Sequence, residues 1–187
     1  MGAYYMATII QEDYLAKMYD THTLGNGLKL MEHSYIGNNY VNHIMSLLDN
    51  DKQKLVWLCD YHEPDEKTQY VWNNVVEESG YAAIDNFEDN KYFIINHSKK
   101  LYIDIEKLHN ILEEKEPSGW YIHPIPILCN SDRDSQGGGD FHKNDPRRAT
   151  WCEDYIQATK EKPGTGYEDA TEECLFFEGK LGDRHTI

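Results

Sequence analysis

The sequence predicts a single α+β domain spanning residues 1–187, with a mainly antiparallel sheet of about five strands and two or three helices on one side. Three observations lead to this class. The chain has the length of one typical domain, and 40% of its residues are hydrophobic, which is enough for a core. Short β-forming segments recur along it. Segments with helical spacing are few and do not alternate regularly with the strands, as a doubly wound fold would require.

The first half of the chain is expected to contain two strands and two helices. Residues 4–10 and 54–61 are short runs of β-forming residues, and the second is continuously apolar. Residues 40–48 carry apolar side chains at helical spacing after a possible cap at Gly37-Asn38-Asn39. A second helix is expected over 70–78, stopped by Gly80. Residues 28–33 fit a strand or a helix start, and residues 12–24 fit neither clearly.

The second half opens with the clearest local signal. Residues 91–96 and 100–105 are β-rich and flank the polar turn His97–Lys99, which predicts a β-hairpin. A short amphipathic helix is expected over 105–114. Pro124 and Pro126 restrict residues 120–128 to an edge strand or an extended crossing segment. Further strands are expected at 150–159 and 173–178.

The charge balance is strongly acidic, at −15 from 33 acidic and 18 basic residues. Phosphate backbones and anionic membranes would be repelled, whereas a basic protein surface would be attracted. Eighteen of the acids lie in two blocks, residues 60–89 and 153–183. If the blocks converge, they form one acidic face. If they do not, they are ordinary solvated surfaces.

The cysteines and the N-terminal segment indicate a cytoplasmic protein without a membrane span. The four cysteines are far apart and form no C-x-x-C pair, which argues against a disulfide framework or a zinc site and favours free thiols in a reducing compartment. The start MGAYYMATIIQED has no basic region and no long apolar run, so we expect no signal peptide. No apolar run approaches the length of a transmembrane helix.

The loop at residues 130–142 is the most unusual motif, because Gly137, Gly138 and Gly139 stand in a row before Asp140. A phosphate-binding loop would need a helix start or a lysine after the glycines, and neither follows. A calcium loop would match Asp132 and Asp134 but would place a lysine where the bidentate glutamate belongs. We therefore expect a surface loop that is structural or contacts a partner.

No catalytic residue and no cofactor or metal is predicted. The nine histidines are scattered without a metal-ligand spacing, although a spatial cluster of His33, His123 and His142 stays open. No G-x-S-x-G or catalytic cysteine signature is present. The expectation is a protein that is not an enzyme.

Several segments carry a resemblance. GLKLMEHSYIGNNYV, YFIINHSKKLYID and HPIPILCNSDRDSQGGGDF resemble blocks in uncharacterised proteins from bacteriophages and mobile elements of Firmicutes. The resemblance implies a bacterial host and transfers no established activity.

Two function hypotheses follow, and a purely structural accessory protein is a third. The first is a phage-encoded, anti-CRISPR-type inhibitor that binds a basic host protein, such as a CRISPR effector or another nucleic-acid-binding protein, and does not bind nucleic acid itself. Its expected contact residues are four acids and two aromatic anchors, Asp65, Glu66, Glu77, Glu78, Trp72 and Trp151. The alternative is a small enzyme or ligand-binding protein that uses the Gly137–Gly139 loop as a pocket.

Overall fold

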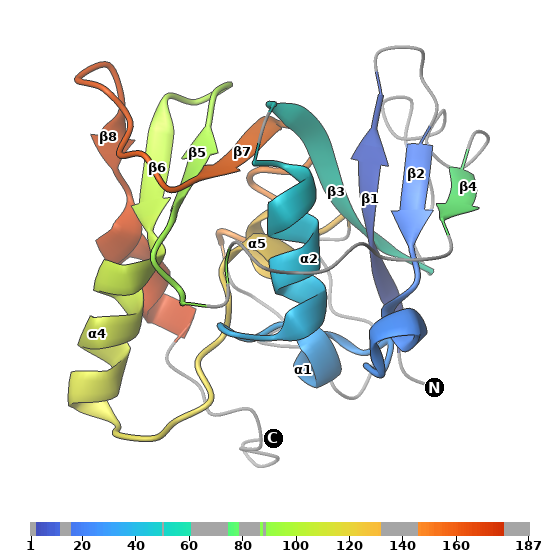
Figure 1. Ribbon diagram of the computed structural model, residues 1–187, viewed down its shortest axis with the longest axis horizontal. Helices are drawn as coiled ribbons and strands as arrows, with labels where there is room; N and C mark the ends of the chain where they lie inside the picture. The colour runs from blue at the N-terminus through green and yellow to red at the C-terminus, as the bar shows by residue number, and fades with distance from the viewer. Residues whose placement is uncertain are drawn as a thin grey trace.

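The computed structural model describes residues 3–11, 16–49, 51–60, 75–78, 87, 89–131 and 146–177, with residues 75–78, 176 and 177 described by their backbone alone. These residues form one mixed sheet with helices packed against it (Figure 1). Eight strands follow the order β4-β2-β1-β3-β7-β5-β6-β8. The strands are β1 (Tyr5–Ile10), β2 (Ala16–Tyr19), β3 (Gln53–Cys59), β4 (Val75–Glu78), β5 (Phe93–Asn96), β6 (Leu101–Asp104), β7 (Tyr155–Thr159) and β8 (Glu168–Asp169).

The helices are short, and most of them lie between the strand pairs along the chain. They are the 3₁₀ helices η1 (Thr21–Leu24) and η2 (Thr171–Phe177), and the α-helices α1 (Leu30–His33), α2 (Asn39–Leu47), α4 (Ile105–Lys115) and α5 (Ile125–Leu128). Figure 1 shows α2 in front of the middle of the sheet and α4 below β6. The α+β class is thereby confirmed.

The six central strands are antiparallel to one another, and each edge strand is parallel to the strand beside it. The sheet is therefore mainly antiparallel, as expected. It has more strands than the predicted five or so, because β2, β4 and β8 are two to four residues long. Such short segments are recognised as strands only by the partners beside them.

Alternation along the strands separates two faces of the sheet. Tyr5, Ala7 and Ile9 of β1 belong to the main core, while Ile10 belongs to a small cluster on the opposite face. The four α-helices in the described residues all contribute to the main core, through Leu30 of α1, a stripe of α2, three residues of α4 and most of α5. The α-helices thus bury their apolar sides against one face of the sheet, as the sequence predicts.

The expected hairpin is confirmed. β5 and β6 pair from Phe93 opposite Asp104 to Asn96 opposite Leu101, with the turn between them. Lys100 ends the turn in the left-handed region, with φ of 59°. The strands at the N-terminus and at β3 and the helices α2 and α4 are also confirmed, with bounds shifted by a few residues at most.

Four local expectations are wrong in whole or in part. The helix expected over 70–78 is strand β4 where it is described, because residues 75–78 pair with β2. The strand expected over 173–178 is replaced through Phe177 by the 3₁₀ helix η2. Residues 125–128 form helix α5 rather than extended chain, since proline is tolerated in the first turn of a helix. Of the strand expected over 150–159, only β7 is extended.

Candidate protein-contact surface

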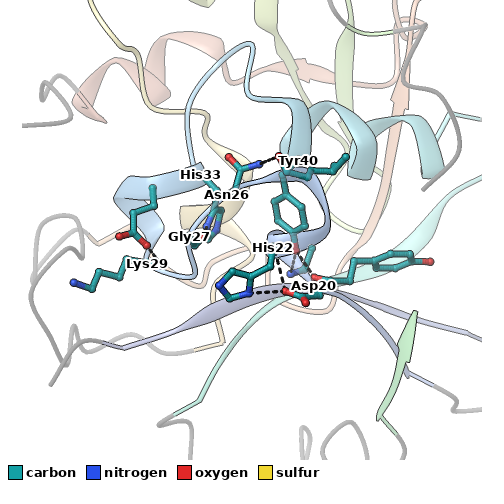
Figure 2. A network of polar contacts seen from close by, with 11 residues as sticks. Asp20, His22, Asn26, Gly27, Lys29, His33 and Tyr40 are labelled. Carbon is teal, nitrogen blue, oxygen red and sulfur yellow. Dashed lines mark hydrogen bonds and ion pairs between the residues drawn. The ribbon is translucent and has the colours of Figure 1, made fainter. Parts of the chain in front are cut away.

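His33 and His123, two of the three histidines that could have formed a site, are instead parts of separate buried networks. The Nε1 hydrogen of Trp57 is donated to Nε2 of His33 over 2.9 Å, so Nδ1 of His33 carries the proton and donates to the carbonyl oxygen of Gly27 over 3.0 Å. Figure 2 shows His33 beside Gly27. Burial lowers the pKa of His33 to about 4. The ring is therefore neutral near pH 7 and ties α1 to the loop before it and to β3.

His123 lies in a second network. Its Nδ1 accepts the Ile125 N–H over 3.3 Å, so its Nε2 donates to the hydroxyl of Tyr92 over 3.0 Å. Burial lowers its pKa to about 3. His142, the third member of the conceivable cluster, lies outside the described residues. Among the described residues, no three His, Cys, Asp or Glu side chains gather in a group that could hold a metal ion.

Polar contacts also fix the loop around η1 to α2 (Figure 2). The Tyr40 hydroxyl accepts the Ala7 N–H over 2.8 Å and donates to the Tyr19 carbonyl over 2.7 Å. Asn26 accepts from Asn38 and donates to Asn39, both over 2.7 Å. These groups satisfy one another inside the fold, so we assign them a structural role.

The structure describes only some of the predicted contact residues. Asp65, Glu66 and Trp72 lie outside the described residues, as do Gly137, Gly138, Gly139 and Asp140 of the glycine loop. Glu77 and Glu78 lie on the edge strand β4.

The prediction that Trp151 contacts a partner is wrong. Trp151 is only 4% exposed and belongs to the main core, and its own backbone N–H donates to the Leu128 carbonyl of α5 over 2.8 Å. A buried ring cannot anchor a partner, so Trp151 is removed from the candidate contacts.

Among the described residues, the two acidic blocks meet where Asp89 of the first pairs with Lys160 of the second, but the strands that carry their other acids lie at opposite edges of the sheet. β4, with Glu77 and Glu78, is at one edge of the sheet, whereas β8, with Glu168 and Asp169, is at the other edge. The glutamates of β4 therefore do not extend the acidic surface at β8.

The second block instead joins the acids of helix α4. Helix α4 packs against η2, and β8 pairs with β6, at the left of Figure 1. We call the carboxylates of α4 and its C-cap, β8 and η2 the acidic edge: Glu106, Glu113, Glu114, Glu116, Glu168, Asp169, Glu172 and Glu173.

The acidic edge is held in place by a lysine in its middle. The Nζ of Lys107 lies 3.1 Å from Asp169 and 3.4 Å from Glu172, and so joins α4, β8 and η2. The carboxylate of Asp169 holds the pKa of Lys107 above its ordinary value. Glu114, Glu168 and Glu173 are exposed and face solvent.

An exposed aromatic residue lies at the end of this edge. Trp120 follows α4 by a short turn and is 61% exposed, the most exposed large apolar side chain among the described residues. Its ring centroid is 5.2 Å from that of Tyr35, with the planes 32° apart. Sequence analysis assigned Trp120 to an edge or crossing segment and missed it as a contact residue. The Pro117-Ser118-Gly119 turn after an acidic helix was the available signal.

Comparisons with protein-family models, curated protein sequences and solved structures found no match for this chain. Among the described residues, no helix is both long and apolar enough to cross a bilayer.

Proposed function

We propose that this protein acts by binding a basic protein through the acidic edge. The observation that supports it is the gathering of eight carboxylates around α4, with an exposed tryptophan at the helix end. Carboxylates attract and orient a partner that carries lysine and arginine, and a desolvated aromatic supplies affinity that surface charges alone do not.

The partner we propose is a nucleic-acid-handling protein of a bacterial host, such as a CRISPR effector, so that the chain is an anti-CRISPR-type inhibitor encoded by a phage. A duplex carries one charge for about every 1.7 Å of its length, and proteins that bind it have basic grooves. An acidic protein edge can occupy such a groove in its place. The resemblance to phage proteins and the charge of −15 support this reading.

The alternative of a small enzyme or ligand-binding protein rests on the Gly137–Gly139 loop. That loop lies outside the described residues, and no observation on the described ones favours it.

The test uses two variants of equal charge. Glu114→Lys/Glu173→Lys reverses two exposed residues of the acidic edge, and Asp51→Lys/Glu161→Lys reverses two exposed acids away from it. Proteins captured from host lysate by the wild-type chain are identified by mass spectrometry, purified and assayed for nucleic-acid binding with each variant present.

We expect the wild type and the Asp51/Glu161 variant to block nucleic-acid binding by the captured protein. The Glu114/Glu173 variant should associate several-fold more slowly, because steering by charge acts mainly on the association rate. Equal inhibition by both variants, or a captured protein whose nucleic-acid binding is unaffected, would contradict the proposal.

A further inference from the structure

Trp120 is an exposed aromatic ring on a rigid backbone. The turn that carries it is closed by three hydrogen bonds: Ser118 N–H to Glu113 Oε1 at 3.0 Å, Gly119 N–H to the Tyr121 hydroxyl at 3.1 Å, and the Tyr121 hydroxyl to Glu113 Oε2 at 2.6 Å. The Tyr121 hydroxyl also contacts the Glu116 carbonyl. The backbone around Trp120 is thus ordered before any partner arrives, and binding there costs little further conformational entropy.

The far side of the turn is fixed to the core. The Tyr121 carbonyl accepts the Ile36 N–H over 2.8 Å, and Tyr35 forms an isolated bridge with Ile122. Tyr35 is therefore held beside Trp120 by the backbone. It supports the indole from one side, while most of the indole surface faces solvent.

The surroundings of Trp120 are acidic. Glu113, Glu114 and Glu116 are close to it in the chain, with Lys115 as the one base among residues 113–116. Hydrogen bonds from the Tyr121 hydroxyl and the Ser118 N–H hold the pKa of Glu113 below its ordinary value, so its carboxylate is charged near pH 7. A cation that approaches the indole face meets negative charge beside it.

Tyrosine rings elsewhere in this protein have lysine ammonium groups over their faces. Lys52 and Lys54 place their Nζ atoms 5.8 and 5.6 Å from the ring centroid of Tyr155, and Lys100 lies 5.1 Å from that of Tyr167. Those tyrosines are already covered by the chain's own lysines. Among the described residues, no cationic side chain covers Trp120 in this way.

We propose that Trp120, supported by Tyr35, binds an arginine side chain of the basic partner. This inference rests on the proposed function and names the chemistry that its surface recognises. A guanidinium group is planar and weakly hydrated, so it stacks on an indole better than an ammonium group does, while its edges bond to the neighbouring carboxylates. Tryptophan is the strongest aromatic partner for a cation.

The experiment uses two peptides of equal length and charge, one containing only arginine as its base and the other only lysine. Binding to the whole protein is measured by isothermal titration at low salt, for the wild type, Trp120→Ala and Tyr155→Ala. Tyr155→Ala is the matched control, since Tyr155 is 39% exposed but already covered by lysines. Circular dichroism confirms that each variant is folded, which the exposure of both rings favours.

We expect the arginine peptide to bind the wild type more tightly than the lysine peptide, and Trp120→Ala to weaken the arginine peptide by about three- to tenfold. Tyr155→Ala should leave both affinities unchanged. Three results would each overturn the inference: equal binding of the two peptides, no loss in Trp120→Ala, or no binding of either peptide to the wild type. If Glu114→Lys/Glu173→Lys weakens the binding of both peptides while Trp120→Ala weakens the binding of neither, the inference that Trp120 binds arginine is wrong. The proposal that the acidic edge is the binding surface then still holds.

Discussion

At the scale of single residues, three histidines in the described part of the chain are buried in their neutral form. Burial lowers the pKa of His33 and of His43 to about 4 and that of His123 to about 3, all well below the ordinary value of 6.5. A proton can bind to one of these rings only if the ring becomes exposed to solvent or carries its charge inside the core. The stability of the fold therefore depends on pH through these three histidines.

We expect the free energy of unfolding to fall between about pH 6.5 and pH 4. Over this window the unfolded chain binds protons on these histidines and the folded chain does not, so stability rises with pH and is lost on acidification. For His33 alone the loss at pH 5 is roughly 2 kcal/mol. Urea unfolding at pH 7, 6 and 5 measures it. The pKa of carboxylates such as Glu113 is lowered in the fold, so their contribution to stability is lost only at the acid end of this window and below it. A free energy that stays level from pH 7 to pH 5 would contradict the histidine assignment.

The hydrogen bond between Trp57 and His33 gives a second residue-scale prediction. Trp57→Phe keeps an aromatic ring but removes the N–H that donates to Nε2 of His33, leaving a buried nitrogen without this partner. We expect a loss of about 1–3 kcal/mol in the free energy of unfolding, to which the smaller ring adds. Trp120→Phe is the matched control, because its ring is mostly in water. Equal stability of the two variants would show that the buried bond contributes nothing.

At the scale of elements, helix α2 depends on one cap. The side chain of Asn38 accepts the N–H groups of Tyr40 and Val41 over 2.8 and 3.2 Å, and its own amide donates to Asn26. Asn38 thus satisfies the start of the helix that covers the middle of the sheet and also fixes the loop before it. Capping residues were visible in the sequence, but the contact with Asn26 was not.

Replacing Asn38 by alanine should lower the free energy of unfolding by about 1–2 kcal/mol, since it removes the cap and leaves Asn26 without a donor. Thermal melting monitored by circular dichroism measures the change. Asn110→Ala, at an exposed position inside α4, is the control and should be neutral or slightly stabilising. A melting temperature unchanged by Asn38→Ala would mean that tertiary packing alone sets the start of α2.

At the scale of the whole molecule, the described residues are built around one main hydrophobic core. None of Cys59, Cys129, Cys152 and Cys174 forms a disulfide, and three of them are buried. Burial raises the pKa of the Cys129 thiol well above its ordinary value. A protonated, buried thiol reacts slowly and packs as a small apolar side chain.

We expect the same melting temperature with and without reductant, and with and without a chelator. The stability comes from apolar burial, which neither reagent touches. Differential scanning calorimetry at one protein concentration gives the comparison. A fall of several degrees with either reagent would show that a disulfide or a metal ion contributes to the native state.

Local structure was predictable wherever a short segment carried its own signal. The hairpin at 91–105 was predictable because two β-rich runs flank a polar turn, and α4 was predictable because its apolar residues recur at helical spacing. The helix expected over 70–78 failed because Val75 and Val76 fit a strand equally well once β2 lies beside them. Periodicity over four residues cannot distinguish the two states.

The sequence by itself determined the α+β class, the acidity, and the absence of a recognisable catalytic motif, because composition and local spacing are properties of the chain alone. Only the tertiary structure decided where the acids lie. It separated β4 from β8 at opposite edges of the sheet and joined the second acidic block to α4. It also buries Trp151, which was expected to contact a partner, and exposes Trp120, which was not. Exposure is set by what packs against a side chain, and those neighbours come from distant parts of the sequence.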